Sequence, residues 1–233
     1  MDEHAALVEA LSALSRYFVG DTTMEQTLTR VAELARDTIG DADEVGITMI
    51  VDGKPGTWVF TNPSILEVDR AQYETGDGPC LQAYDTGKPV LLRSTLSSAD
   101  YPQFCEAAID HGIFSVASFP LATAAGRIGA MNHYARSKDA FGPAEMALGQ
   151  RFAHQASFLL ANATAYWDAR TLSEDLRQAM ASRATIEQAK GIIMATAGVD
   201  ADEAFAILRE QSQNENVKLR DIACELVNRQ SRR

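Results

Sequence analysis

Cysteine is scarce in this chain of 233 residues: there are three, at positions 80, 105 and 224, and none belongs to a CxxC pair. An odd number of widely spaced cysteines does not suit a disulfide framework or a structural zinc site, and is typical of proteins kept in a reducing compartment. The four histidines are not paired at ligand spacing either. We therefore expect no metal site, and the sequence names no cofactor.

Long hydrophobic runs are also missing. The longest uncharged apolar runs, Ile47–Val51 and Ile113–Ala117, are far shorter than the roughly 20 residues that span a bilayer. The chain opens with Met1-Asp2-Glu3-His4 rather than with a basic segment followed by an apolar one, which argues against export. We expect a cytoplasmic protein that has no membrane partner.

Basic charge is outnumbered, but unevenly along the chain. There are 21 Lys and Arg against 32 Asp and Glu, for a net charge of −11. Residues 1–169 hold 11 basic and 22 acidic side chains, whereas residues 170–233 hold 10 of each. Nucleic-acid binding is driven by Lys and Arg that neutralise phosphate, so the first part is poorly suited to it. The asymmetry indicates two domains with different partners.

The first part of the chain alternates helix and strand signals. Apolar spacing predicts a helix over Leu7–Phe18, and Thr22 with Glu25 has the pattern of a capping box for a second helix that ends at Gly40. We therefore expect an α+β fold, with a central antiparallel sheet flanked by helices. The predicted strands are 45–51, 57–61, 89–92, 114–121 and 128–134, and the predicted short helical segments are 80–84 and 102–111.

A long helix is predicted from Pro143 onward, because neither Gly nor Pro occurs between residues 150 and 190. Apolar residues keep a spacing of three and four through this stretch, including Leu159, Leu160, Leu172 and Leu176. A periodic helix of this length is typical of a coiled coil, so residues 143–180 are expected to connect the domains and to hold a homodimer. The alternative is two separate helices with a break near Asp168.

The last part of the chain predicts three helical segments. Gly198 ends the first, Asp200 with Glu203 caps the second, and Asn216 caps the third. Helical spacing places the basic residues of this part at the edges of its apolar core. The expected product is a small three-helix module.

This module contains several separated motifs: Arg183–Met194, Ala204-Phe205, Leu208-Arg209 with Ser212, and Lys218–Ala223. Together they resemble the ANTAR domain, over about residues 172–228. The resemblance implies an RNA-binding output domain, here placed at 172–233, that recognises paired hairpins in a nascent transcript and prevents transcription termination. Unpaired loop bases suit such recognition, because they are exposed to side chains. The expected RNA-binding residues are Arg183, Gln188, Lys190, Gly191, Arg209, Ser212, Lys218 and Arg220.

Within this set we expect Lys190 to read a loop base, since Gly191 beside it leaves room for close approach. Lys218 and Arg220, at the start of the third helix, are expected to contact phosphate. The structural alternative is that the Lys190 stem covers packed side chains and that Arg183 and Lys190 pair with Glu187 on a solvated helix face.

The first part contains the segments Gly76–Cys80, Gly87–Val90, Ser115–Leu121 and Ile128–Asn132. They resemble the GAF domain, a small-molecule or signal-sensing α+β module, and the resemblance spans most of residues 1–163. It implies a sensor domain, although a GAF fold does not identify its ligand. The candidates to line a ligand pocket, whose alternative role is plain core packing, are Trp58, Phe60, Tyr73, Cys80, Phe104, Phe119 and Tyr134.

The two resemblances together predict a signal-responsive transcription antitermination regulator rather than an enzyme. Cys80 is either an oxidant-sensing thiol or, more commonly for such a residue, a small buried apolar group. One enzymatic alternative remains, because free methionine-(R)-sulfoxide reductases are also GAF folds that work through cysteines. Cys80 and Cys105 would then be the attacking and resolving thiols. A further alternative is a sensor dimer whose last domain binds protein and has no RNA affinity.

Overall fold

The computed structural model describes residues 8, 9, 12 and 23–231. The chain forms two compact units that divide between Trp167 and Asp168, and each is described by itself below. Most of the helix predicted over Leu7–Phe18 lies outside the described residues, as does Thr22. Within the described residues, no helix combines the length and the apolar character needed to cross a membrane.

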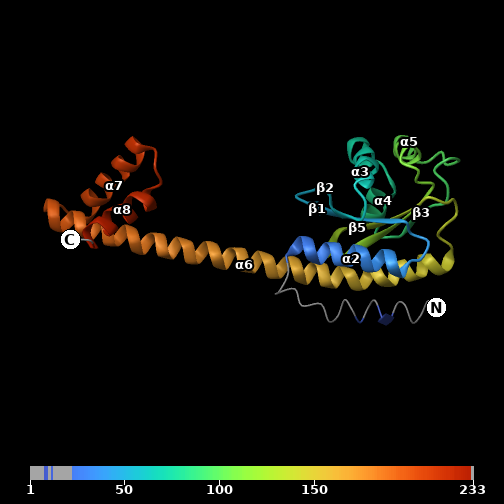
Figure 1. Cartoon of the computed structure of the whole chain (residues 1–233), viewed down its shortest axis with the longest axis horizontal. Helices are drawn as coiled ribbons and strands as arrows, with labels where there is room; N and C mark the ends of the chain where they lie inside the picture. Colours follow the sequence, from blue (N-terminus) through green and yellow to red (C-terminus); the bar gives the residue numbers. More distant parts are fainter. Residues whose placement is uncertain (1–7, 10–11, 13–22, 232–233) are drawn as a thin grey trace. The chain divides into compact units, whose positions relative to one another are not determined.

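The first unit is an antiparallel sheet with helices on both faces, which confirms the predicted α+β class (Figure 1). The strand order is β2-β1-β5-β4-β3, so β2 and β3 form the edges. Helices α3, α4 and α5 cover one face, and α2 with the first part of α6 covers the other. The elements are α2 (Met24–Thr38), β1 (Glu44–Val51), β2 (Lys54–Phe60), α3 (Ser64–Thr75), α4 (Pro79–Thr86), β3 (Val90–Leu92), α5 (Pro102–Asp110), β4 (Ser115–Thr123), β5 (Gly126–Ala135) and α6 (Pro143–Ala197).

Alternation along the strands divides the core of this unit between the two faces. On β4 and β5, Phe119 and Met131 point toward α2 and α6, where they pack in one buried cluster with Phe152 of α6. Val116 and Tyr134 point the other way and pack in a second cluster with residues of α3 and α5. Each face of the sheet is therefore buried by its own helices.

Helix α2 begins one residue later than the sequence pattern suggests. The side chain of Thr23 accepts a hydrogen bond from the Gln26 N–H, and the Gln26 side chain accepts one from the Thr23 N–H, which completes a capping box. The capping box is thus formed by Thr23 with Gln26, each one residue after the predicted pair, Thr22 with Glu25. Both pairs have the same spacing, and the sequence pattern alone does not choose between them.

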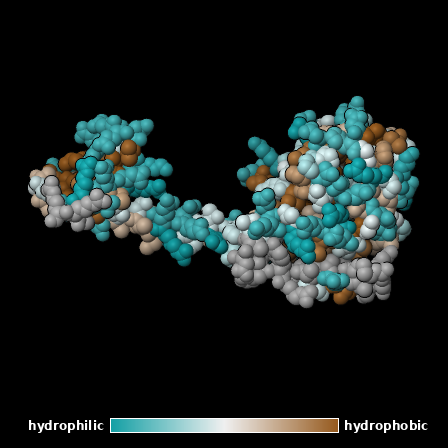
Figure 2. All heavy atoms as spheres, viewed as in Figure 1, coloured by the Kyte–Doolittle hydropathy of each residue, from teal (hydrophilic) through white to brown (hydrophobic). Residues whose placement is uncertain are grey.

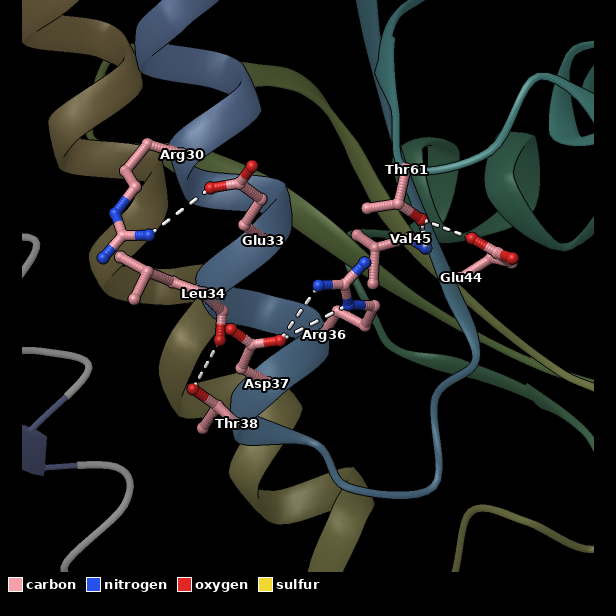
Figure 3. A network of polar contacts seen from close by, with 9 residues as sticks. All are labelled: Arg30, Glu33, Leu34, Arg36, Asp37, Thr38, Glu44, Val45 and Thr61. Carbon is pink, nitrogen blue, oxygen red and sulfur yellow. Dashed lines mark hydrogen bonds and ion pairs between the residues drawn. The ribbon is translucent and has the colours of Figure 1, made fainter.

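Figure 3 shows polar contacts along α2 and at the start of β1. Arg30 pairs with Glu33 at 3.3 Å, and both side chains are close to half exposed. Exposed ion pairs of this kind contribute at most about 1 kcal/mol, so α2 is held mainly by its apolar side. At the start of β1, the Thr61 hydroxyl accepts the Val45 N–H at 2.9 Å and donates to Glu44 at 2.7 Å. This side-chain bridge ties the end of β2 to β1.

The hairpin between β1 and β2 is tighter than predicted. Asp52 and Gly53 alone form the turn, with φ values of 51° and 74°, so β2 begins at Lys54 rather than at Thr57. The register shifts next to Ile47 and leaves Trp58 without a cross-strand partner. Its side chain is 43% exposed. The bulge therefore places the tryptophan outside the core.

Helix α3 has no counterpart in the sequence-based prediction. Its buried side combines the apolar residues Ile65 and Val68 with the polar residues Asp69 and Gln72. Because half of this stripe is polar, the apolar periodicity of a core-facing helix is interrupted. The helix ends at Gly76, whose φ of 69° is in the left-handed region.

Helix α6 runs for 55 residues and passes Asp168 without a break, so the alternative of two separate helices is not the arrangement of this chain. Within the seam predicted along it, Leu160 is buried against the first unit. Leu172 and Leu176 are 69% and 59% exposed, and Met180 one turn later is 65% exposed. The seam is therefore covered in its first part and open in its second.

The second unit consists of the last part of α6, α7 (Ala201–Glu215) and α8 (Leu219–Ser231), as predicted. The capping box of Asp200 with Glu203 is confirmed. Asn216, in contrast, does not start the third helix: it ends α7 in the left-handed conformation, with φ of 52°. Asparagine tolerates this conformation better than most residues, and for that reason it serves at both kinds of helix end. The buried core consists of Ala189, Leu208, Ile222 and Ala223.

Candidate functional site

The basic residues of α6 in the second unit differ in their exposure to solvent and in whether they form an ion pair. Arg183 is exposed. Lys190 has only 16% of its side chain exposed, and its Nζ donates to both carboxylate oxygens of Glu187, at 3.2 and 3.1 Å. The Lys190 ammonium is thus paired along its own helix in this structure, in the way that the structural alternative describes.

The start of α8 also combines a cation in an ion pair with an exposed cation. Arg220 pairs with Asp221 at 3.3 Å, while Lys218 is exposed just before the helix begins. Ser212 donates its hydroxyl hydrogen to the Val217 carbonyl at 2.6 Å, which fixes the connection between α7 and α8. Ser212 therefore has a structural role in the free protein. Arg209 on α7 is exposed.

Gly191 lies in a groove of about 580 Å³ between α6 and α8. A Cβ atom at this position would meet nothing within 4 Å, so the packing of the chain does not require a glycine here. Glycine inside a helix nevertheless costs about 1 kcal/mol relative to alanine. None of the residues that line the groove is charged. They are Gln188, Gly191, Ile192, Ala195, Thr196, Val227 and Gln230.

Hydrophobic side chains also reach the surface of the second unit (Figure 2). Phe205 and Ile207 on α7 are 39% and 41% exposed, and Val217 before α8 is 39% exposed. Surface patches that combine such residues with polar neighbours are typical of interaction sites. The second unit thus presents both exposed cations and apolar surface.

In the first unit, a group of buried polar side chains surrounds Asp69 on the sheet face covered by α3 and α4. The hydroxyl of Tyr134 and the amide of Gln72 donate to Asp69 Oδ1, at 2.5 and 2.8 Å. The Thr57 hydroxyl donates to Oδ2 at 2.6 Å. We call the following set the Asp69 cluster: Thr48, Thr57, Asp69, Gln72, Tyr73, Asn132 and Tyr134.

The hydrogen bonds of the cluster continue across the sheet. The Tyr73 hydroxyl lies 2.8 Å from the Thr57 hydroxyl and 2.7 Å from that of Thr48. Asn132 donates to Thr48 at 3.2 Å. Gln72 accepts the backbone N–H of Cys80 at 3.0 Å, at the start of α4. One continuous network therefore joins α3 to β1, β2, β5 and α4.

Burial dominates the acid–base behaviour of this region. It raises the pKa of Asp69 to about 6, although the hydrogen bonds from Thr57, Tyr134 and Gln72 act in the opposite direction. Burial and the nearby Asp69 carboxylate raise the pKa of the Cys80 thiol to about 12. Burial and the charge of Asp100 also raise the pKa of Cys105. Since the thiolate is the nucleophilic form, neither cysteine is activated in this structure.

The structure separates the predicted pocket residues. Phe104 and Tyr134 pack in the cluster under α3 and α5, with Phe60 against its edge. Cys80 is buried beside the Asp69 cluster. Phe119 lies on the opposite face of the sheet and contributes to a groove of about 560 Å³ near α6. Because Phe119 faces α6 and Trp58 faces solvent, these two do not share a cavity with the others.

Sequence reasoning missed the Asp69 cluster apart from Tyr73 and Tyr134. A usable signal was present, because Asp69 and Gln72 continue the helical spacing of Ile65 and Val68. An acidic residue on the apolar face of a helix is a candidate for a special role. Among the residues that the structure describes, no three His, Cys, Asp or Glu side chains are grouped so as to hold a metal ion.

Two family models match this chain. The model of the GAF domain matches residues 21–161, and the model of the ANTAR domain matches residues 174–227. A search of curated proteins gives no match.

Solved structures similar to the first unit include enzymes and other GAF domains. The free methionine-R-sulfoxide reductase from Neisseria meningitidis, in complex with its substrate, is 17% identical with a TM-score of 0.55, over 70% of this chain and 91% of that one. The reduced reductase from Staphylococcus aureus is 15% identical with a TM-score of 0.55, over 68% and 95%. The GAF domain of a phosphoenolpyruvate-protein phosphotransferase from Coxiella burnetii is 15% identical with a TM-score of 0.53, over 72% and 98%. At these identities the likeness concerns the fold alone.

Proposed function

The chain belongs to the GAF domain family and carries an ANTAR domain after its GAF domain, and from this premise we propose a transcription antitermination regulator. Its ANTAR domain, residues 172–233, binds hairpin RNA in nascent transcripts and prevents termination. Its GAF domain, residues 1–163, controls that binding in the cytoplasm in response to a signal. The observation that carries the proposal is the presence of both family matches in one chain, a sensing module followed by an output module.

The RNA-binding residues have separate roles in this proposal. The exposed cations Arg183, Arg209 and Lys218 contact phosphate, and Arg220 joins them by exchanging Asp221 for the RNA. Lys190 likewise exchanges Glu187 for the RNA. Such exchanges cost little free energy, because partly exposed ion pairs contribute only about 0–1 kcal/mol to stability.

The groove around Gly191 is the proposed site for an unpaired loop base. Ile192 and Val227 provide apolar surface for the base, and the Gln188 and Gln230 amides provide both donors and acceptors for its edge. Gly191 leaves the α6 backbone open to close approach. Ser212 supports this surface by fixing the connection between α7 and α8.

We propose that the full chain is a homodimer held by residues 143–180. The support is the exposed row formed by Leu172, Leu176 and Met180, which a second copy would cover in a coiled coil. Two ANTAR domains on one RNA with two hairpins would also raise affinity, because the second contact becomes intramolecular.

The GAF domain is proposed to sense a small molecule without catalysis. The raised pKa values of Cys80 and Cys105 support this, because both thiols are held in the less reactive form. The likeness to free methionine-R-sulfoxide reductases favours one enzymatic alternative, in which these two cysteines act in turn. Turnover of free methionine-(R)-sulfoxide that disappears in Cys80→Ser would establish that alternative and overturn a purely sensory role.

The proposed function is tested by purifying the full chain from cells and sequencing the RNA bound to it. A two-hairpin transcript from that set is then titrated with the protein, and single-hairpin versions serve as controls. We expect the two-hairpin RNA to bind most tightly and binding to weaken as salt is raised. If no transcript is enriched and no hairpin RNA binds, the antitermination proposal fails and a protein partner for the second unit takes its place.

A further inference from the structure

The Asp69 carboxyl is an unusual group in the first unit, because it is fully buried and has only hydrogen-bond donors around it. Its partners are the hydroxyls of Thr57 and Tyr134 and the amide of Gln72. No ion pair to a Lys, Arg or His is recorded for it within the described part of the chain. When Asp69 is ionised, its charge therefore has no counter-charge.

The titratable groups that face Asp69 are acids that remain neutral when it ionises. They are Tyr73 from α3, Tyr134 from β5 and Cys80 from α4, and the pKa of each is raised, mainly by burial. Strands β1 and β2 contribute only hydroxyls, from Thr48 and Thr57. Helix α5, which packs against α3, contributes Cys105 to the adjoining apolar cluster. Nothing in this set compensates a negative charge.

We propose that the Asp69 carboxyl is a proton-binding site that sets how firmly α3 and α4 are held on the sheet. With the proton bound at Oδ2, the carboxyl donates to the Thr57 hydroxyl, which then donates to Tyr73, 2.8 Å away. The whole network is then uncharged. When the proton leaves to solvent, Thr57 turns back to donate to Oδ2, and the cluster must hold a bare charge.

The direction in which pH changes the attachment of α3 and α4 follows from the burial of Asp69. Burial raises the pKa of Asp69 from 3.8 to about 6, so between these values the folded cluster binds a proton that the unfolded chain releases. The attachment is therefore strongest below pH 4 and weakens as the pH rises to about 6, above which it stays constant. The two pKa values correspond to a roughly 100-fold change in the opening equilibrium.

The contacts of the network identify the segment that responds. Asp69 bonds to strands β2 and β5, Tyr73 bonds to β1, and Gln72 holds the first turn of α4 through the Cys80 N–H. Residues 64–86 are thus attached to the sheet by apolar packing and by a polar network with the Asp69 carboxyl at its centre.

The first experiment follows Asp69 itself in the full chain. The carboxyl carbons of ¹³C-labelled aspartates are titrated by NMR in the wild type and in Asp69→Asn. We expect one carboxyl with a midpoint near pH 6 that is missing from the variant. The control Asp77→Asn removes an exposed carboxyl before α4 and should leave this midpoint in place. If no aspartate of the wild type titrates near pH 6, the proposal is wrong.

The second experiment measures the attachment of residues 64–86 by their hydrogen exchange at pH 5 and pH 7.5, corrected for the intrinsic exchange rate at each pH. Opening should increase with pH in the wild type, by about 10-fold over this interval, and change much less in Asp69→Asn. An equal increase in both proteins would overturn the proposal.

Tyr134→Phe keeps the test decisive if Asp69→Asn does not fold. It removes one donor to the carboxylate while keeping the ring that packs in the core. Because that donor stabilises the ionised form, its loss should raise the Asp69 midpoint above the wild-type value. A purely structural role of Tyr134 would not move the midpoint, and an unchanged midpoint in this variant counts against the proposal.

Discussion

Two glycines inside α6 stand in opposite surroundings. A Cβ at Gly149, in the first unit, would lie 2.3 Å from the Phe119 ring, whereas a Cβ at Gly191, in the second unit, would meet nothing within 4 Å. Both residues carry the same cost in a helix. The fold explains Gly149, because only glycine lets α6 approach β4 this closely. Gly191 has no such explanation inside the chain, which is why we assign it to contact with RNA.

The same contrast extends to the units themselves. In the first unit, the Asp69 carboxyl points inward and accepts hydrogen bonds from the side chains of Thr57, Gln72 and Tyr134. In the second unit the buried core is small, and cations and apolar side chains such as Arg209 and Phe205 face outward. One unit is organised around its interior and the other around its surface, which is consistent with the sensor and output roles proposed for them.

The largest effect is expected where the two units share α6. Replacing both Leu172 and Leu176 by Asp should weaken the proposed dimer by at least about 100-fold, roughly 3 kcal/mol, because unpaired charges would be buried in the contact. Analytical ultracentrifugation measures the association. Gln178→Asp, which introduces one charge on the same exposed stretch but away from these leucines, is the control and should leave the dimer intact. Monomeric wild-type protein at micromolar concentration would rule out the dimer.

The two glycines should respond with opposite signs when each is changed to alanine. Gly149→Ala is expected to destabilise the protein by about 1–3 kcal/mol, because Phe119 must move out of a packed core. Gly191→Ala should instead stabilise its helix by about 0.5–1 kcal/mol. Thermal unfolding followed by circular dichroism compares the two variants. If Gly191→Ala destabilises the protein, the fold itself needs this glycine, and the contrast between Gly149 and Gly191 is wrong.

For RNA binding, Gly191 should be the more sensitive of these two glycines. Gly191→Ala and Gln188→Ala are expected to weaken binding of the cognate hairpin by about 1–3 kcal/mol and to reduce discrimination between loop sequences. Lys218→Ala should weaken all RNAs alike and lower the salt dependence by about one unit of slope. Fluorescence titrations at two salt concentrations separate these roles. Equal binding by Gly191→Ala and wild type would remove the groove from the RNA site.

The smallest predicted effect concerns the ion pair between Lys190 and Glu187. Glu187→Gln frees the Lys190 ammonium and should strengthen RNA binding by less than about 1 kcal/mol, since the pair competes with the RNA. Lys190→Ala should weaken binding. If both variants bind RNA as the wild type does, Lys190 covers the core and takes no part in recognition.

Sequence patterns predicted the elements whose signals are local. Asp200 with Glu203 specifies a helix start within four residues, and the short strand signals at 114–121 and 128–134 predict β4 and β5. Helix α3 escaped prediction because Asp69 and Gln72 occupy its buried side, and their partners lie on strands that are distant in sequence.

The candidate sites were less predictable than the fold, since they depend on three-dimensional neighbours. The strand period alone does not predict the exposure of Trp58, which follows from a bulge. The pairing of Lys190 with Glu187 was visible as spacing, but its burial was not. The Asp69 cluster required knowledge of which strands lie side by side, and this depends on the order β2-β1-β5-β4-β3.

The edges of that sheet also determine how the protein avoids aggregation. Exposed strand edges present unpaired backbone groups that can template pairing with another chain. Here β2 opens with Lys54 and Pro55, a charge and a residue without an N–H, and the opposite edge strand, β3, is only three residues long. Both edges are poor templates for strand addition. The sheet is thereby guarded against fibre-like growth, and the dimer proposed to form through α6 would leave both edges of the sheet as they are.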